Sequence, residues 1–287
     1  MGPVIDAHVH IVSPELSREA QPYIEKDDFL AQICSSPGHR FASAGDLLAE
    51  MDRCGVERAA ICSFPFSDEG LCREINDYLL EAARAHPGRF MPMASVDPRE
   101  SWMEREIARC HDGGAVGVGE LFPWGQNFAL SGSEAARLAA CCRERGLILL
   151  LHTNEPVGHN YAGKGPAYLK EAAAFALDHP QLQLIYAHWG GGLLFYELMP
   201  ELKRGLQHLF YDTAAGPFLY NPRIYRAARE IGILHKILLG TDYPLLSPRR
   251  YLKELAESGL SAAEQRLIRR ENAAALFPRA GAEKQNG

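Results

Sequence analysis

The sequence has 287 residues, a length that suits one large α/β domain. It is 47% hydrophobic and 23% charged with a net charge of −6, so it lacks the basic surplus typical of nucleic-acid-binding proteins. No apolar stretch approaches the roughly 20 residues of a membrane span, and the N-terminus leads directly into a strand-like run. We therefore expect no membrane anchor and no signal peptide.

The seven cysteines are scattered along the chain and form no Cys-x-x-Cys pair. This spacing disfavours a zinc ribbon and favours reduced, mostly buried thiols. Together with the expected absence of a targeting segment, it predicts a cytoplasmic protein.

Short apolar runs alternate with longer helical patterns along the whole chain. The predicted strands are 3–9, 58–64, 90–96, 115–121, 147–152, 183–188, 209–213 and 236–241. Apolar residues recur at three- and four-residue spacing between them, which predicts helices over 44–53, 69–85, 102–110, 133–145, 168–177 and 222–230. The stretch 193–203 fits a helix less well because Pro200 lies inside it.

Strands that are apolar on both faces and are joined by helices indicate a parallel sheet. Eight such units predict a single-domain (β/α)₈ TIM barrel over residues 1–279, with an open doubly wound sheet as the alternative. The small polar segment 280–287 is expected to be a flexible tail. The longest irregular stretches, 13–43 and 154–166, follow the first and fifth strands and are expected to cover the mouth of the barrel.

The carboxyl ends of the predicted strands carry side chains that bind metals. These are His8 and His10 on the first strand, Glu120 on the fourth, His152 on the fifth, His188 on the sixth and Asp242 after the eighth. Because these strand ends meet around one mouth in a barrel, we expect the side chains to converge on a divalent metal. Zinc is the expected ion, with manganese, iron or nickel as alternatives, and either one or two ions are compatible with this set.

Each of these residues also has a structural interpretation. A single polar residue at a strand end can be a cap, and Glu120 can pair with Lys164 or an arginine instead of a metal. Strict alternation along the fourth strand places Val118 and Glu120 on the same face. If the valine points into the barrel, Glu120 therefore points there too.

The segments around these residues resemble the amidohydrolase superfamily, in particular its amidohydrolase-related branch (amidohydrolase 2). The matching segments are "IDAHVHI", "LLLHTN", "YAHWGGG", "LLGTDYPL" and "RENAAALF", which follow the family's order over nearly the whole chain. The resemblance implies a (β/α)₈ barrel with one or two divalent metals and with His8, His10, His152 and Asp242 as ligands. It makes His188 a ligand of a second metal or a group that polarises the substrate.

Two further comparisons with the superfamily concern single residues. Glu120 resembles the strand-four glutamate that bridges two metals in the related TatD-type hydrolases. Decarboxylases of the branch usually carry an acid soon after the strand-six histidine, as His-x-Gly-Glu, and this chain has Gly191 at that place. This departure disfavours the decarboxylase interpretation.

We therefore expect a metal-dependent hydrolase of a small carboxylic ester, lactone or amide. Asp242 is the expected general base, and His188 is expected to stabilise the developing oxyanion or to hold a second metal. The alternative within enzymes is non-oxidative decarboxylation of an aromatic or unsaturated acid. The alternative outside enzymes is a barrel that binds a metal or metabolite without turnover, which would not need a base such as Asp242.

Four residues are candidates for contact with a small-molecule substrate. Trp124 and Trp189 follow strand ends and could wall the pocket, or could simply pack in the core. Arg40 and Lys164 lie in loops at the same end and could hold a substrate carboxylate, although a solvated surface charge is the more common fate of either. The sequence is compatible with a homodimer but does not specify one.

Overall fold

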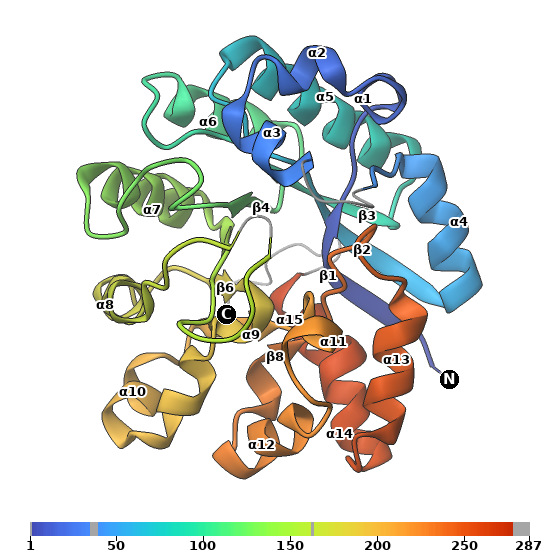
Figure 1. Ribbon diagram of the computed structural model, residues 1–287, viewed down its shortest axis with the longest axis vertical. Coiled ribbons are helices and arrows are strands. Elements are labelled where there is room, and N and C mark those ends of the chain that lie inside the picture. The colour runs from blue at the N-terminus through green and yellow to red at the C-terminus, as the bar shows by residue number, and fades with distance from the viewer. Residues whose placement is uncertain (1, 35–39, 162–163, 278–287) are drawn as a thin grey trace, which may run out of the picture.

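The computed structural model describes residues 2–34, 40–161 and 164–277 (Figure 1). The predicted flexible tail, residues 280–287, lies outside the described residues. The described strands form one parallel sheet in which each strand pairs with the next along the chain. They are β1 (Val4–His10), β2 (Val56–Cys62), β3 (Phe90–Ala94), β4 (Gly117–Leu121), β5 (Ile148–Leu151), β6 (Leu184–Tyr186), β7 (Leu209–Asp212) and β8 (Ile237–Leu238).

Hydrogen bonds between β1 and the residues that follow β8 close the sheet. The backbone N–H of Ala7 donates to the carbonyl of Leu239 at 2.7 Å, and that of Thr241 donates to His8 at 3.2 Å. The eight parallel strands therefore form a nearly closed (β/α)₈ barrel, and the predicted fold class is confirmed.

Helices surround the barrel (Figure 1). The first half of the chain contributes α1 (Pro14–Arg18), α2 (Gln21–Ile24), α3 (Asp28–Cys34), α4 (Ala44–Cys54), α5 (Glu69–Ala85), α6 (Met103–Asp112) and α7 (Ser133–Arg145). The second half contributes α8 (Leu169–Asp178), α9 (Ala187–Gly190), η1 (Leu193–Leu198), α10 (Pro200–Gly205), α11 (Gly216–Leu219), α12 (Ile224–Ile231), η2 (Leu234–Lys236), α13 (Pro248–Glu257), α14 (Ala262–Arg266), η3 (Leu267–Glu271) and α15 (Asn272–Leu276).

The stretch 13–43, which the sequence predicts to be irregular, contains the three short helices α1, α2 and α3. The hydroxyl of Ser13 accepts a hydrogen bond from the N–H of Leu16 at the start of α1. Such caps satisfy N–H groups that a helix end leaves free, so they make very short helices possible. The predicted helix 193–203 is divided into η1 and α10, and the division falls at Pro200 as the missing N–H of proline requires.

The apolar core has two layers, as the alternation of side chains along strands requires. One lies inside the barrel and includes Ile5, Met93, Leu150 and Ile185. The other lies between the strands and the helices and includes Val118. The polar site lies above the inner layer, at the carboxyl ends of the strands.

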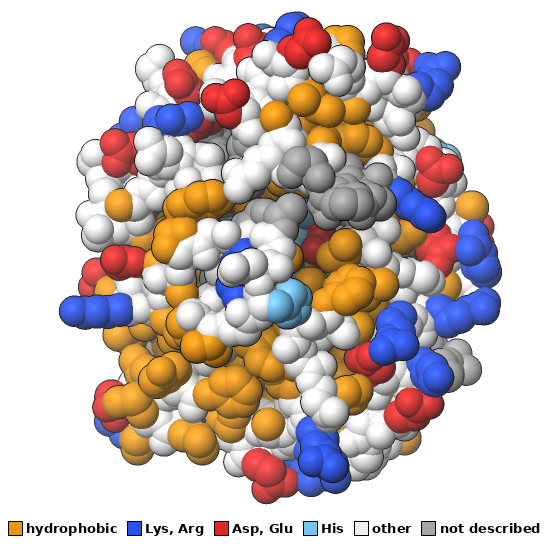
Figure 2. Space-filling view, viewed as in Figure 1, with side chains coloured by type: hydrophobic (Ala, Val, Ile, Leu, Met, Phe, Trp, Pro, Cys, Tyr) orange, Lys and Arg blue, Asp and Glu red, His pale blue; other side chains and the backbone are white. Residues whose placement is uncertain are grey.

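The face of the molecule seen in Figure 2 is hollowed near its centre, and acidic and histidine side chains are visible in the hollow. All seven cysteines are free thiols. Within residues 2–34, 40–161 and 164–277, no helix combines the length and the apolar character needed to cross a bilayer.

Candidate metal centre

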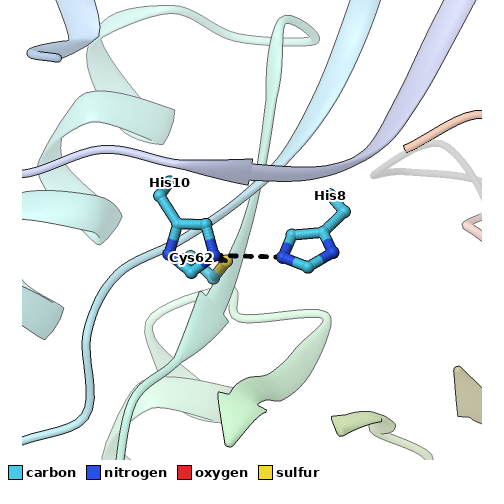
Figure 3. Close-up of side chains that lie close together, drawn as sticks. All are labelled: His8, His10 and Cys62. Carbon is cyan, nitrogen blue, oxygen red and sulfur yellow. Dashed lines mark hydrogen bonds between the residues drawn. The ribbon is translucent and has the colours of Figure 1, made fainter. Parts of the chain in front are cut away.

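His8 and His10 reach the barrel mouth through an irregularity in β1. Ile5 and Ala7 both lie in the inner core, as residues two apart on a strand should. The pairing with β2 then shifts between Asp6 and Val9, and Val9 packs in the outer layer against α4. The shift turns both imidazoles inward, where their Nε2 atoms lie 3.0 Å apart (Figure 3). Both imidazoles therefore lie on the same side of the strand.

Glu120 reaches the same mouth by a different route from the predicted one. Val118 lies in the outer layer, so the prediction that it shares a face with Glu120 is wrong. Gly119 has a φ of +136°, and the pairing with β5 shifts between Val118 and Leu121. A Cβ at Gly119 would lie within 3.0 Å of Leu150, so only glycine fits where the strand reverses its alternation.

The carboxylate of Glu120 lies between two pairs of histidines. Its Oε2 is 3.2 Å from Nε2 of His10 and 3.4 Å from Nε2 of His8. Its Oε1 is 3.1 Å from Nδ1 of His152 and 3.3 Å from Nε2 of His188. The alternative that Glu120 pairs with Lys164 does not describe this structure. A carboxylate placed in this way can offer one oxygen to each of two cations.

In three of the histidines, the ring nitrogen that points away from Glu120 shows which nitrogen of the ring carries the free lone pair. Three of them face oxygen acceptors: His8 Nδ1 faces Asp212 Oδ2 (2.8 Å), His152 Nε2 faces Asn154 Oδ1 (3.0 Å) and His188 Nδ1 faces the carbonyl of Ala214 (3.2 Å). A ring nitrogen that donates to such an acceptor leaves the other nitrogen unprotonated in a neutral imidazole. The nitrogens directed at Glu120 are therefore the ones free to bind a metal, which is the usual arrangement of metal-binding histidines.

The contact between His8 and His10 provides a test of whether these residues fit a metal. Two ring nitrogens 3.0 Å apart, both beside a carboxylate oxygen, need a proton or a cation between them. Outward donation by His8 to Asp212 leaves its Nε2 without a proton of its own. A divalent metal satisfies both nitrogens and the carboxylate together, so the donor set fits such an ion.

Asp242 borders the same cluster on the solvent side. Its Oδ1 lies 3.4 Å from Nε2 of His10, and its backbone N–H donates to the carbonyl of His8 at 2.9 Å. The residue has a φ of +55°, which aims the side chain back over the end of β1. Its side chain is 18% exposed, against 2% for Glu120, so Asp242 is the more accessible of these two carboxylates.

The electrostatics of the cluster follow from its burial. Burial alone raises the pKa of Glu120, but the charges of His8 and His152 hold that pKa well below its usual range. Burial alone lowers the pKa of His8, whereas the charges of Glu120 and Asp212 raise it well above its usual value. The carboxylates thus strongly favour positive charge on the groups beside them. A bound metal ion would supply such a positive charge.

Cys62 is a neighbour of the centre that the sequence interpretation missed. It ends β2, pairs with His10 across the two strands, and places its sulfur 3.8 Å from Nδ1 of that residue (Figure 3). Burial raises the pKa of this thiol, but the positive charge of His10 lowers it to about 7. The signal was present in the sequence, since Cys62 lies two residues before the end of the predicted strand 58–64, next to the strand that carries His10. Asn154 was missed in the same way, two residues after His152.

The four predicted substrate contacts are placed differently from one another. Trp189 is 1% exposed and packs edge-on against Tyr225, which agrees with the packing alternative. Trp124 is 41% exposed and lies on the backbone of Gly165. Arg40 is exposed.

Lys164 is occupied within its own loop. Its ammonium group donates to the carbonyls of Val157 (2.8 Å) and His159 (3.0 Å). It therefore braces the segment that follows β5.

The absence of an acid after His188 has a structural reason. Gly191 has a φ of +57°, and a Cβ there would lie within 3.0 Å of the carbonyl of Asn154. A glutamate at this position would displace the segment that orients His152. The local backbone therefore excludes the His-x-Gly-Glu arrangement.

Comparisons with known proteins agree with this geometry. The family model described as Amidohydrolase (Amidohydro_2) matches residues 5–279. A search of curated proteins returned no match.

Three solved structures illustrate the likeness in fold. 5-Carboxyvanillate decarboxylase from Sphingomonas paucimobilis is 15% identical, with a TM-score of 0.73 over 98% of this chain and 100% of that one. A dihydroxybenzoic acid decarboxylase from Polaromonas, with bound manganese and the inhibitor 2-nitroresorcinol, is 20% identical, with a TM-score of 0.67 over 96% and 97%. A probable 2-pyrone-4,6-dicarboxylic acid hydrolase from Acinetobacter baumannii is 17% identical, with a TM-score of 0.66 over 96% and 98%.

The family model spans nearly the whole chain, and the quoted segments of the sequence lie within it. The predicted superfamily is therefore confirmed. The chain belongs to the amidohydrolase family and is a TIM-barrel enzyme.

Proposed function

We propose that the enzyme is a metal-dependent hydrolase that cleaves a small carboxylic ester, lactone or amide. The observation that carries the proposal is the position of the Glu120 carboxylate, one oxygen beside each of two histidine pairs. We assign His8, His10 and Asp242 to a first metal and His152 and His188 to a second. Glu120 would contribute one carboxylate oxygen to each of them.

The nitrogen and oxygen donors of the site suit several divalent ions. We propose zinc, with manganese as the alternative because one of the similar structures contains it. A divalent metal supplies Lewis acidity, which polarises a carbonyl group and lowers the pKa of water towards about 7.

Asp242 is the proposed general base. Its partial exposure lets its carboxylate accept a proton from the attacking water and return that proton to the leaving group. His188 keeps its Nε2 directed at the centre because its Nδ1 donates to Ala214, and we propose that it is a ligand or stabilises the oxyanion. Asp212 positions His8 and does not contact the substrate.

Non-oxidative decarboxylation of an aromatic or unsaturated acid is the second candidate. It is favoured by the similarity to the two decarboxylases, which is as extensive as the similarity to the hydrolase. The presence of Gly191 in place of an acid argues against it. Both reactions would use the same metal centre, so the product formed distinguishes them.

The test is a panel of lactones, esters, amides and hydroxybenzoic acids, incubated with zinc- and manganese-loaded protein. Release of acid indicates hydrolysis, and release of labelled carbon dioxide indicates decarboxylation. Asp242→Asn, which keeps the shape but removes the base, should lower turnover about 10²-fold or more. If the only turnover found is carbon dioxide release, and it depends on Asp242, the hydrolase proposal is wrong and the second candidate replaces it.

The cellular setting is also a proposal. We propose a cytoplasmic enzyme acting on a small molecule. Fractionation of the producing cells tests the location. Mass measurement in solution tests whether the chain is a monomer or a homodimer.

A further inference from the structure

Glu155 is a buried carboxylate beside the metal centre that the proposed reaction does not use. It follows β5 three residues after His152, and it is 9% exposed. Its Oε2 accepts a hydrogen bond from the hydroxyl of Tyr161 at 3.2 Å. Its Oε1 is buried without a hydrogen-bond partner. A buried carboxylate oxygen in this state is costly unless a donor reaches it.

Hydrogen bonds connect Glu155 to the centre. The hydroxyl of Tyr161 also lies 3.4 Å from Oδ1 of Asn154, the same atom that faces Nε2 of His152 at 3.0 Å. Burial raises the pKa of Tyr161 and of Tyr220, and the charge of Glu155 raises both further. Glu155 therefore lies on the wall of the site formed by the segment after β5.

The described surroundings of Glu155 supply no compensating cation. Lys164, the nearest basic residue along the chain, donates to the carbonyls of Val157 and His159. Across residues 2–34, 40–161 and 164–277, no lysine or arginine forms an ion pair with Glu155. A negative group of a substrate placed here would meet an uncompensated negative charge at low dielectric.

Aromatic rings stand at other sides of the same centre. The ring of Phe122 lies 4.8 Å from that of His152, and Phe64 stacks on His10 with a centroid distance of 5.1 Å. These rings place apolar surface beside two of the histidines of the centre.

We propose that Glu155 is a specificity-determining residue that accepts a hydrogen bond from a hydroxyl or amino group of the substrate. This inference rests on the proposed function, because the reacting carbonyl is taken to lie at the Glu120 centre. Oε1 receives the substrate donor while Tyr161 holds Oε2. Substrates with a donor at this position are favoured, and substrates with a second carboxylate there are rejected.

Binding of benzohydroxamates to metal-loaded protein tests the proposal by calorimetry. The hydroxamate group is a general metal chelator, and the ring carries the variable group. We compare benzohydroxamate with its hydroxy, amino and carboxy derivatives, each as meta and para isomers. We expect one hydroxy or amino isomer to bind about tenfold more tightly than benzohydroxamate, because a hydrogen bond to a buried charge is strong. We expect the carboxy derivative of that isomer to bind about tenfold more weakly or not at all.

Glu155→Gln is the matching variant, because it keeps the shape and removes the charge. It should bind benzohydroxamate normally, lose most of the preference for the hydroxy or amino derivative, and bind the carboxy derivative better than the wild type. Glu201→Gln, at an exposed position in α10, is the control and should behave like the wild type.

The outcomes separate the two proposals. Equal binding of all derivatives to the wild-type protein overturns the role of Glu155 whether or not the variant folds, and leaves the metal centre intact. Preferences that persist in Glu155→Gln also overturn it. Benzohydroxamate that binds no better to metal-loaded than to metal-stripped protein contradicts the proposed metal centre itself, and the inference that rests on it.

Discussion

The carboxylate of Asp212 accepts a hydrogen bond from Nδ1 of His8 at 2.8 Å, at the base of the metal centre. Its other oxygen accepts from the backbone N–H groups of His188 and Ala214, at 2.9 and 3.0 Å. Both oxygens of Asp212 are therefore acceptors, and together they fix His8 on β1 and His188 just after β6. Sequence analysis placed Asp242 at the centre but could not connect Asp212 to His8, because the two residues are far apart in the chain.

Asp212→Asn should weaken metal binding about 10- to 100-fold, the usual effect of losing a group that orients a metal-binding histidine. An asparagine has one acceptor oxygen, so it must turn an N–H₂ group towards one of the donors that Asp212 now satisfies. Metal titration of the stripped protein measures the loss. Asp178→Asn, at an exposed position in α8, is the control. Unchanged affinity in Asp212→Asn would mean that His8 does not bind the metal.

Glu120→Gln tests the two-metal assignment. A carboxamide can offer only one oxygen, so the variant cannot bridge. We expect the metal content to fall from two equivalents towards one, and turnover to fall about 10²-fold or more. Elemental analysis after gel filtration measures the content, and Glu144→Gln on the surface is the control. Two equivalents with near-normal turnover would contradict the bridging role.

Gly119→Ala tests the reversal of alternation that brings Glu120 into the barrel. The added Cβ would collide with Leu150. The alanine would also have to adopt a φ of +136°, which residues with a Cβ rarely do. We expect loss of metal binding together with a loss of stability of several kcal/mol. Gly146→Ala is a matched control, because that residue has a φ of +64° and open space around it. It should cost only about 1 to 2 kcal/mol and keep the metal.

Urea unfolding measures the stability of the wild type and of both variants. If Gly119→Ala is no less stable than Gly146→Ala and still binds its metals, the close approach to Leu150 does not determine the position of Glu120.

His208 gives a prediction about pH that is independent of the centre. Burial lowers its pKa, although its hydrogen bond to the carbonyl of Ala176 raises it in part. The folded protein therefore favours the neutral ring. Below the unfolded pKa of about 6.5 the unfolded chain binds more protons than the folded one, so this contribution to stability is present above that pH and is lost as the pH falls.

His208→Gln, which retains a donor for Ala176, should lose less stability than the wild type between pH 8 and pH 5.5. Urea unfolding at both pH values measures the difference. His111→Gln, at an exposed position, is the control. A variant that loses as much stability as the wild type over this range would show that His208 does not contribute to the acid sensitivity.

Much of the barrel was predictable because its signals are local. The spacing of apolar residues located α5 and α7 to the residue, since both helices bury one regular stripe and end at punctuating residues. The polar residues at strand ends indicated the mouth, because parallel strands bring these ends together.

The remainder depends on non-local contacts. Apolar periodicity could not reveal the register shift between Asp6 and Val9 in β1. At this point Asp6 accepts hydrogen bonds from Thr241, which is 235 residues away in the sequence. The reversal at Gly119 depends on the backbone of β5, and the tie between Asp212 and His8 depends on the closed barrel. Each is a property of neighbouring strands rather than of one segment.

The two strand irregularities have a consequence for protein design. On ideal, uninterrupted strands the residues at positions 8 and 120 would point towards the helices. Position 8 follows Ala7, which faces the inner core, and position 120 is two residues after Val118, which faces the outer layer. Copying the six site residues onto a regular eight-stranded scaffold would therefore misdirect part of the set. A designer who wishes to transplant this centre must transplant its defects as well, including the glycine of β4 and the threonine that holds Asp6.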